Sequence, residues 1–474
     1  MQKERKLMNT SPSCKKRLLI SILALVALYA GAAVFPYAFP PACEKQGMEA
    51  HLFFSRERQR AAILESGEEA LWGRLYLIDH ARERICLSSY LFACDDSGRV
   101  ISAALLRAAD RGVQVDILVD GLIGQINFSG SALPYALGTH ENIRIGLYNP
   151  PSFFQPQALN ARLHDKYLVA DETCMILGGR NISDEFLVEE SHPFYNADRD
   201  VMLFSENGED CAAGQLACYF NELWQGEYVQ PAYETGGNAE EIAAEKAACR
   251  ALLQRMEGEK ESRYASMEAD DFTVPVSSTE LICNPVQPCV KEPVVFTRLC
   301  ELMQGAKERV RLQSPYFVLN GAMQRMLEQA VSGPAEVTFY TNSAASGNNL
   351  VASADTLWQK GRVLSLNARM YEVQTPYSVH TKSMLVDGQL SVFGSFNFDM
   401  RSAYIDTEVM LVVESRELNE RLAGHMDAVE QNAIRVTENG VVPDDAVAMA
   451  PMNVGKQAAI WLLSPVVFLI RYLL

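Results

Sequence analysis

The chain has 474 residues, of which 48% are hydrophobic and 21% are charged, and its formal net charge is −17 at pH 7. This length is enough for two or three domains, and the composition is that of a globular protein able to bury a sizeable core. A strongly negative protein repels polyanions, so the net charge disfavours nucleic acid as a partner.

The N-terminal region combines a basic cluster at residues 15–17 with an apolar run, residues 18–35, that Pro36 stops. The run is just long enough to span the hydrocarbon core of a bilayer, and the basic cluster favours a cytoplasmic N-terminus. We expect residues 1–43 to form a cytoplasmic N-terminus and a single anchor in the cell membrane, with the remaining domains extracytoplasmic. A cleaved signal peptide ending near residues 30–32 is the alternative.

Two segments in the middle of the chain resemble each other. Residues 81–92 read ARERICLSSYLF and residues 306–317 read AKERVRLQSPYF. Each is followed by a helical stretch and then by a short β-rich run, so the pattern predicts two α/β units. We place these units at residues 44–235 and 276–440, joined by a charged linker or solvated helix at 236–275.

The C-terminal run from Ala458 to Leu474 is also apolar, but Pro465 interrupts it and Arg471 charges it. It is too short and too broken to span a bilayer. We expect residues 441–474 to form a tail whose apolar segment lies on the membrane surface. A terminal helix packed on the protein is the alternative.

Each half carries one copy of a short motif. The first copy is His164-x-Lys166-x4-Asp171, followed after six residues by Gly178-Gly179-x-Asn181. The second copy is His380-x-Lys382-x4-Asp387, followed after six residues by Gly394-Ser395-x-Asn397. A single copy would mean little, but two copies with equal spacing at matching places of a repeat indicate a function.

The spacing points to phosphate chemistry. His and Lys of each motif lie two residues apart at the start of a predicted strand, so their side chains share a face. A neutral imidazole can attack phosphorus, and lysine and asparagine can hold phosphate oxygens, while glycine permits close approach of the backbone. The predicted catalytic residues are His164, His380, Lys166 and Lys382, and the predicted phosphate-binding residues are Asn181, Asn397, Gly179 and Ser395.

Four carboxylates complete the candidate site. Asp171 and Asp387 belong to the catalytic motifs, but they follow the strand, and we expect them to fix a turn. A reacting histidine also needs an acceptor on its other ring nitrogen, and we predict that Asp200 in RDVML and Glu408 in TEVML orient the histidines. No Walker, HExxH or GxSxG pattern occurs, so neither a metal nor another cofactor is expected.

With the doubled HxKxxxxD motif and trailing GGxN or GSxN, the chain resembles the phospholipase D superfamily from about Gly47 to Asn432. GGRNISDEF at 178–186 and GSFNFDMRSAYIDTEVML at 394–411 look most like the bacterial cardiolipin synthase branch. The resemblance implies an α/β fold of two similar phospholipase D-like domains, with mixed β-sheets flanked by helices. It also implies a pseudo-twofold relation and one metal-free site at the interface.

The resemblance further implies a reaction. One histidine, which we expect to be His164, attacks a phosphodiester and forms a phosphohistidine, while His380 protonates the leaving alcohol and then activates the acceptor. This predicts a membrane-anchored phosphatidyltransferase that makes cardiolipin from phosphatidylglycerol, with a phospholipid substrate and no protein partner implied. A phospholipase D-type phosphodiesterase acting on phospholipid or another phosphodiester is the alternative, and a catalytically inactive membrane scaffold is a third hypothesis.

Overall fold

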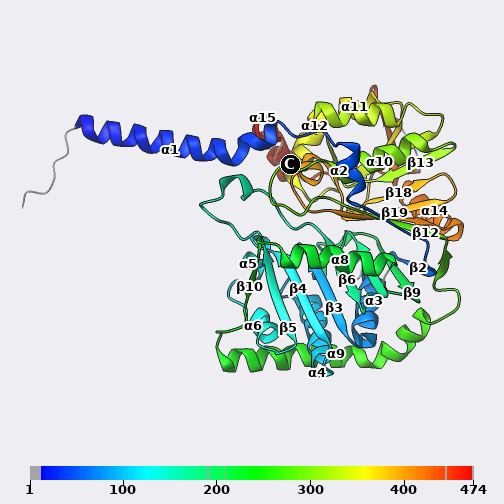
Figure 1. The fold of residues 1–474 in the computed structure, drawn as a ribbon. Helices are drawn as coiled ribbons and strands as arrows, with labels where there is room; N and C mark the ends of the chain where they lie inside the picture. The colour runs from blue at the N-terminus through cyan, green and yellow to red at the C-terminus, as the bar shows by residue number, and fades with distance from the viewer. Residues whose placement is uncertain (1–11, 189–191, 209, 443–445, 472–474) are drawn as a thin grey trace, which may run out of the picture.

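The computed structural model describes residues 12–188, 192–208, 210–442 and 446–471. Two halves, each built on one large mixed β-sheet with helices on its faces, lie one above the other (Figure 1). The first sheet has the order β10-β5-β4-β3-β6-β7-β9-β2-β11, and the second has the order β1-β12-β21-β19-β18-β13-β15-β16-β22-β23.

The central strands of the two sheets correspond in pairs. The first sheet contains β2 (Gln59–Leu64), β3 (Arg84–Ser89), β4 (Gln114–Asp120), β5 (Ile143–Tyr148), β6 (Lys166–Ala170), β7 (Cys174–Gly178), β9 (Asp200–Ser205), β10 (Val229–Ala232) and β11 (Val274–Val276). The second contains β1 (Leu52–Ser55), β12 (Ser278–Cys283), β13 (Arg309–Gln313), β15 (Glu336–Asn342), β16 (Arg369–Val373), β18 (Ser383–Val386), β19 (Leu390–Gly394), β21 (Val409–Glu414), β22 (Ala433–Thr437) and β23 (Gly440–Val441). In the first sheet β3, β4 and β5 run parallel, and in the second β13, β15 and β16 do the same. The strand that begins beside the motif lysine, β6 or β18, pairs antiparallel with β3 or β13. The predicted pair of α/β halves is therefore confirmed.

The repeat segments form the central strands because their apolar residues are buried. β3 and β13 come from the two similar segments, and all their residues after the first are buried. α4 (Asp96–Asp110) follows β3, and its N-cap residue Asp95 accepts a hydrogen bond from the Gly98 N–H at 3.0 Å. α11 (Gly321–Ala330) follows β13 and is capped in the same way by Asn320. These caps satisfy N–H groups that lack a partner within the helix.

The two halves share an apolar core between their sheets. α8 (Ala212–Gln225) belongs to the first half and α14 (Arg416–Glu430) to the second, and both contribute fully buried residues to it. Phe220 and Leu422 are examples, each 0% exposed. Burying one such side chain contributes roughly 1.5–3 kcal/mol, so the shared core fixes the junction where the motif strands meet. The outer faces are covered by α3 (Gly67–His80) and α4 in one half and by α10 (Val294–Gly305) and α11 in the other.

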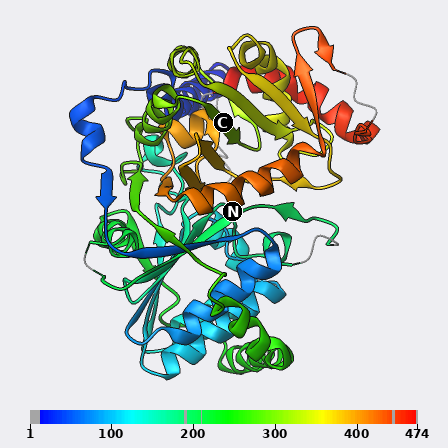
Figure 2. The same ribbon diagram turned by 90° about the vertical axis from the view of Figure 1, so that its right-hand side faces the viewer.

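The chain crosses between the halves near both expected boundaries. β1 falls within the range expected for the first domain, but it pairs antiparallel with β12 in the second sheet. Figure 2 shows the stretch after β1, drawn in blue, running into the first half. In the expected linker, α9 (Ala239–Met267) packs on the first half, with Cys249 and Leu253 in its core, and β11 pairs with β2. The linker range is therefore part of the first half.

Among the described residues one helix is long and apolar enough to cross a membrane. α1 (Pro12–Ala38) projects from the body, and its candidate span is Lys16–Ala38, whose most apolar stretch is 6% buried (Figure 1). The expectation of one apolar N-terminal helix is confirmed. The expected cytoplasmic N-terminus at residues 1–11 lies outside the described residues.

The apolar C-terminal run forms α15 (Val454–Ile470), which packs on α12 (Leu350–Leu364). Ile460 and Val467 are buried against Ala354, so this part of the tail is a packed helix, as the alternative expectation had it. Another face of α15 is open, because Trp461 is 75% exposed. Residues 472–474 of the expected apolar run lie outside the described residues.

Candidate active site

The segments before the two motif histidines are each held by the opposite half. Leu163 forms a parallel bridge with Thr407, and the His164 N–H donates to Thr407 Oγ1 at 3.1 Å. In the same way β17 (Ser378–Val379) pairs with β8 (Asn196–Ala197), and the His380 N–H donates to the Ala197 carbonyl at 2.6 Å. Both histidines therefore lie at the junction, and their positions depend on both halves.

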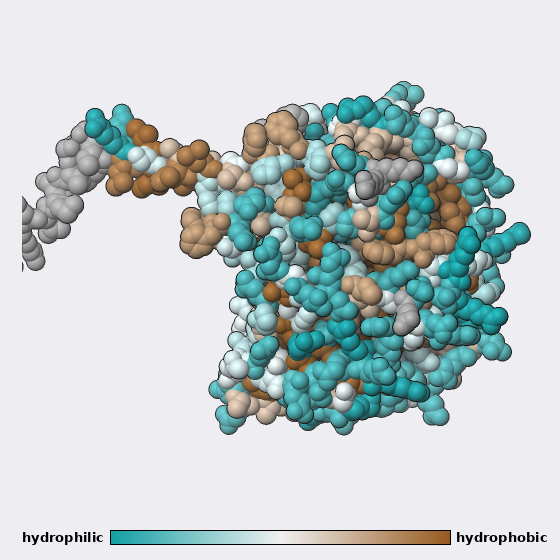
Figure 3. Space-filling view, viewed as in Figure 1, coloured by the Kyte–Doolittle hydropathy of each residue, from teal (hydrophilic) through white to brown (hydrophobic). Residues whose placement is uncertain are grey.

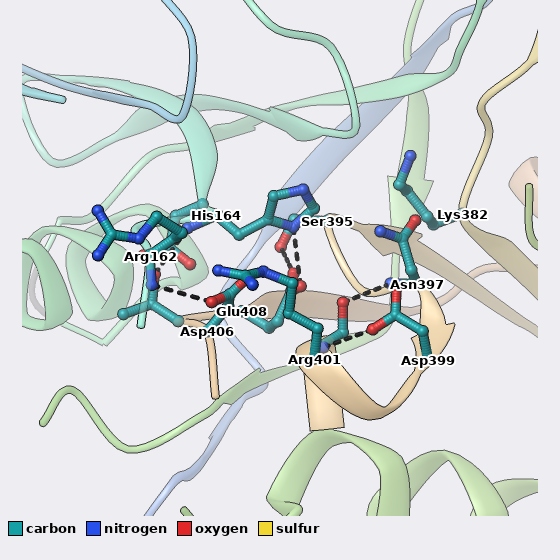
Figure 4. A network of polar contacts seen from close by, with 12 residues as sticks. Arg162, His164, Lys382, Ser395, Asn397, Asp399, Arg401, Asp406 and Glu408 are labelled. Atoms are coloured by element: carbon teal, nitrogen blue, oxygen red, sulfur yellow. Dashed lines mark hydrogen bonds and ion pairs between the residues drawn. The ribbon is translucent and has the colours of Figure 1, made fainter. Parts of the chain in front are cut away.

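Each histidine bonds a buried carboxylate from the other half. His164 Nδ1 lies 2.8 Å from Glu408 Oε1, and His380 Nδ1 lies 2.7 Å from Asp198 Oδ2. Glu408 is 0% exposed and Asp198 is 1% exposed. A carboxylate on Nδ1 selects the tautomer in which Nε2 carries the reactive lone pair, which is the role predicted for Glu408. Figure 4 shows the His164 ring, Glu408 and Ser395 close together.

The prediction that Asp200 orients a histidine is wrong. Its carboxylate accepts a hydrogen bond from Arg74 at 2.9 Å and lies 3.5 Å from Arg180, and all three side chains are buried. Asp198, two residues earlier, takes the place expected for Asp200. Asp200 instead compensates buried arginine charge inside the first half.

The register of the strands explains the error. Gly178 pairs with Asp200, whereas its counterpart Gly394 pairs with Met410, so Asp198 rather than Asp200 corresponds to Glu408. The match of RDVML to TEVML is thus shifted by two residues. Two residues are one strand period, which leaves the side chain on the same face, so alternation could not reveal the shift.

Gly179 and Ser395 support the carboxylates, which differs from the phosphate contact predicted for them. The Ser395 hydroxyl donates to Glu408 Oε2, and its N–H donates to the Val409 carbonyl at 3.0 Å. At Gly179 an added Cβ would collide with Asp198 Oδ2. The second half therefore pairs the longer acid Glu408 with Ser395, and the first half pairs the shorter acid Asp198 with Gly179.

The motif lysines are buried beside their histidines. Lys166 Nζ donates to the His164 carbonyl, and Lys382 Nζ lies 3.7 Å from Asp198 Oδ2. Burial lowers the pKa of Lys166 to about 7 and that of Lys382 to about 8, although Glu408 and Asp198 oppose the shifts. A bound phosphate anion would offset this loss of solvation and favour the charged lysines.

Burial and the neighbouring lysines also lower the pKa of both histidines, to about 4 for His380 and well below the ordinary value for His164. The carboxylates differ from each other. Burial would raise the pKa of Asp198, but Lys382 and His380 outweigh it and lower the value to about 2. Burial raises the pKa of Glu408 to about 7 against the opposing effect of Lys166. At neutral pH Asp198 is therefore the more fully ionised acid.

The two motif asparagines keep hydrogen-bonding capacity in the site. Asn397 Nδ2 donates to the Tyr316 hydroxyl at 3.1 Å. The Oδ1 atoms of Asn181 and Asn397 are buried and have no hydrogen-bond partner among the described residues. Asn181 lines a cavity together with His380. Buried amide groups of this kind are normally paired, so these atoms are suited to bind a ligand.

Asp171 and Asp387 bind backbone rather than histidine. Asp171 accepts hydrogen bonds at 2.8–3.0 Å from the N–H groups of residues 82–84, and Asp387 accepts them from residues 307–309 at 2.8–3.2 Å. Both have a positive φ, 51° and 53°, which aspartate tolerates better than most residues. They hold the turns that lead into β3 and β13.

Sequence reasoning missed a second symmetric pair. Asp120 ends β4, and its Oδ2 accepts a hydrogen bond from the Leu163 N–H at 3.0 Å. Asn342 ends β15, and its Oδ1 accepts one from the Val379 N–H at 2.9 Å. Each side chain thus fixes the residue before a motif histidine. Asp120 and Asn342 could have been identified from the sequence, because each stands at the end of the second strand of its repeat.

Aromatic and charged residues complete the surroundings. The ring of Tyr90 meets His164 edge-on at 5.3 Å between centroids, and Phe186 does the same to His380. Near His164, Asp406 accepts from the Arg162 N–H at 2.9 Å and from Arg401 Nε at 2.8 Å (Figure 4). This network ties the segment that carries His164 to the second half.

Comparisons with known proteins agree with this geometry. The family described as cardiolipin synthase, PLD-like domain, matches residues 75–224 and 299–429, more than half of the chain. Cardiolipin synthase C of Escherichia coli (strain K12) is 28% identical over 394 residues, which cover 75% of this chain and 81% of that protein. Cardiolipin synthase A of Pseudomonas entomophila (strain L48) is 25% identical over 390 residues, 79% of this chain and 69% of that protein.

A solved structure has a similar fold. The crystal structure of phosphatidylserine synthase from Haemophilus influenzae Rd KW20 matches with a TM-score of 0.60 at 15% sequence identity, covering 94% of this chain and 100% of that one. Both matched family segments contain one complete motif with its histidine, lysine and asparagine. The chain therefore belongs to the phospholipase D superfamily, in the cardiolipin synthase family of phospholipase D-like domains, and is an enzyme of the transferase or phosphodiesterase kind.

Proposed function

We propose that the protein is a membrane-anchored phosphatidyltransferase that makes cardiolipin from phosphatidylglycerol through a phosphohistidine at His164. The observation that carries the proposal is the crossed pair of histidine–carboxylate contacts, His164 with Glu408 and His380 with Asp198, at one junction lined by two buried lysines. The names of the cardiolipin synthase relatives support the choice of substrate.

The first step transfers the phosphatidyl group to the enzyme. His164 Nε2 attacks phosphorus, because Glu408 holds its Nδ1 and burial keeps the ring neutral. Lys166 and Lys382 stabilise the charge on the phosphate oxygens. As the bond to the glycerol head group breaks, His380 gives its proton to the leaving oxygen, and ionised Asp198 stabilises the protonated ring against the opposing effects of burial and Lys382.

The second step regenerates the enzyme. The hydroxyl of a second phosphatidylglycerol passes its proton to His380 and attacks phosphorus, and the bond to His164 breaks. The product is cardiolipin, and His380 is again protonated for the next cycle. Water in place of the lipid hydroxyl would give phosphatidic acid by the same path, so the acceptor site decides between transfer and hydrolysis.

Apolar side chains near α1 support attachment to a membrane. Phe153 stacks on Tyr29 of α1 with 4.6 Å between ring centroids, and its neighbour Phe154 is 91% exposed. Figure 3 shows α1 as an apolar rod leaving a mainly hydrophilic body. With Trp461 of α15 exposed as well, these groups are of the kind that insert at a bilayer interface.

The basic cluster near the start of α1 indicates the orientation in the membrane. Residues 15–17 are Lys, Lys and Arg, which favour the cytoplasmic side. The catalytic halves would then face the extracytoplasmic side. Protease treatment of intact spheroplasts tests this, since the halves should be cleaved there; protection until lysis would reverse the orientation.

Purified full-length protein in phosphatidylglycerol vesicles tests the reaction. We expect cardiolipin and free glycerol in equal amounts, and none of either with His164→Ala. Formation of phosphatidic acid alone would make the protein a phospholipase, and cleavage of nucleic acid in EDTA without action on lipid would make it a nuclease. Either outcome would overturn the proposal.

A further inference from the structure

An open pocket of about 560 Å³ lies where the membrane helix joins the body, and it shares no lining residue with the cavity that contains the second motif histidine. Its walls come from the end of α1, the first turn of α11, and the C-terminal ends of α12 and α15 (Figure 1). We call this space the helix-base pocket, and it is defined by residues 38–40, residues 319–322, Arg362, Met400 and Arg471.

The end of α1 is fixed to the body, so the pocket keeps its place relative to the membrane helix. Tyr37 is 1% exposed, and its hydroxyl donates to the Gln157 carbonyl. The candidate span ends at Ala38, which belongs to the pocket wall, and the next residue in that wall, Phe39, is 72% exposed. With α1 in a bilayer, the pocket therefore lies at the depth of the lipid head groups, where the helix leaves the hydrocarbon core.

The pocket is cationic although the whole chain has a formal net charge of −17. Its described lining residues include two arginines and no aspartate or glutamate. Arg471 is compensated by buried Asp355 at 2.7 Å, whereas exposed Arg362 forms no ion pair within the described ranges. Arg325 is also exposed and without an ion pair there, and its Nη1 lies 3.5 Å from where a Cβ on Gly321 would stand. Two guanidinium groups are thus open to an anion from outside.

The lining suits the phosphate of a lipid better than a free phosphate ion. Guanidinium groups bind phosphate oxygens through paired, charge-assisted hydrogen bonds. The first turn of α11 adds the partial positive charge of a helix N-terminus. Phe39, Leu319 and Met400 supply apolar surface, on which the glycerol backbone and upper acyl chains of a lipid can lie. A free phosphate ion would leave that apolar surface unused.

A short β-ladder joins the pocket to the catalytic site. β14 (Phe317–Val318) pairs in parallel with β20 (Phe398–Asp399). The residue after each strand lines the pocket. The residues before them are Tyr316 and the motif residue Asn397, whose side chains share a hydrogen bond of 3.1 Å. A lipid held in the pocket therefore sets the position of the membrane surface relative to the motif asparagine.

We propose that the helix-base pocket is a non-catalytic site for the phosphate head group of an anionic membrane lipid, held by Arg325 and Arg362. The bound lipid stays intact, because neither motif histidine lines the pocket. It seats the second half on the bilayer and adds to α1 a second attachment that depends on lipid charge. The inference rests on the membrane attachment proposed above and is independent of the transfer reaction.

Lipid binding to the full-length protein in a neutral detergent tests the site. The probe is short-chain phosphatidic acid, which has the phosphate but no phosphodiester to cleave, and native mass spectrometry counts the bound lipids. Arg325→Gln combined with Arg362→Gln should weaken the binding of one lipid about tenfold or more, and each single substitution should give part of this loss. Arg435→Gln removes an exposed guanidinium outside the pocket and should leave lipid binding unchanged.

Release of p-nitrophenol from bis-p-nitrophenyl phosphate, a soluble phosphodiester, checks the fold of the variants. This activity should be the same in the double variant as in the wild type, because the catalytic groups are untouched. A variant that keeps both the activity and full lipid binding would overturn the site.

Two competitors and one activity result complete the test. Phosphatidylcholine should not replace phosphatidic acid, and if it binds equally well the site does not select an anion. Displacement of the lipid by millimolar inorganic phosphate would make the pocket a site for the free ion. Wild-type protein that binds the lipid in an arginine-dependent way but makes no cardiolipin would overturn the proposed function and support this inference.

Discussion

The His164 site and the His380 site share one plan but differ in their acids. His380 faces Asp198, whose pKa is lowered to about 2, so its negative charge is present throughout the neutral range. His164 faces Glu408, whose pKa burial raises to about 7, and a serine hydroxyl shares that carboxylate. The first carboxylate opposes the lowering of its histidine's pKa, and the second holds a ring that burial keeps neutral.

This difference supports assigning unequal roles to the histidines. An acid catalyst needs a proton to give, and a fixed anion beside it stabilises the imidazolium. A nucleophile needs a free lone pair, which burial and Lys166 favour at His164. In the proposed mechanism the approximate twofold arrangement carries two different chemical tasks, so substitutions on the two sides should give different results.

The largest effect is expected from the histidines themselves. His164→Ala should abolish turnover of every substrate, because no covalent intermediate can form. His380→Ala should abolish turnover of phosphatidylglycerol but still release p-nitrophenol from a p-nitrophenyl phospholipid, whose leaving group needs no proton. Burst kinetics measure this difference, and His140→Ala serves as the control. Equal loss of p-nitrophenol release in both variants would contradict unequal roles.

Asp198→Asn should lower kcat by about 10²–10⁴-fold, by analogy with carboxylates that hold a catalytic histidine. Asp198 raises the pKa of His380, so its loss lowers that pKa. Since His380 must be protonated to act as an acid, the alkaline limb of the pH–rate profile should move to lower pH. Asp110→Asn removes an exposed carboxylate and is the control. A limb that stays in place would remove Asp198 from this role.

Ser395→Ala should lower kcat about tenfold, because it removes one hydrogen bond to a buried carboxylate. That hydrogen bond lowers the pKa of Glu408, so the pKa should rise further above 7 in the variant and shift the matching limb of the pH–rate profile upward. Ser391→Ala, on the same strand, removes a buried hydroxyl without a partner among the described residues and should change neither quantity.

The smallest effect on catalysis is expected at the motif aspartates. Asp387→Asn should lower the free energy of unfolding by about 1–3 kcal/mol while kcat stays near the wild-type value. Backbone N–H groups outweigh burial and lower the pKa of Asp387 below 3.8. Its contribution to stability is therefore present above pH 3.8 and is lost as the pH falls through the lowered value. Denaturant titration checks this, and a large fall in kcat with unchanged stability would contradict it.

The sequence predicted the two α/β halves because β3 and β13 carry similar buried runs and because the motifs repeat with equal spacing. Glu408 could be predicted as a histidine-orienting residue because it directly precedes the apolar strand β21. The crossing of the histidine–carboxylate pairs could not be predicted, since it depends on how the halves pack. Nor could alternation distinguish Asp198 from Asp200, which lie one strand period apart.

The Gly178-Gly179 pair indicated the positions of the carboxylates, which the similarity of RDVML to TEVML did not. Side chains at Gly178 and Gly179 would collide with Asp200 and Asp198, so the Gly-Gly pair reflects two carboxylates facing one turn. In the second half Ser395 fits because its hydroxyl binds the longer acid. Contacts that join distant segments, such as β1 with β12, depend on chain crossings that no local pattern encodes.

Mapping the covalent intermediate tests the central claim most directly. His380→Ala protein is mixed with a p-nitrophenyl phospholipid, quenched within milliseconds, digested under alkaline conditions and sequenced by mass spectrometry. The account predicts a phosphatidyl group on the peptide that contains His164, and none when His164 is also replaced. A modified residue other than His164 in wild-type or variant protein would contradict it.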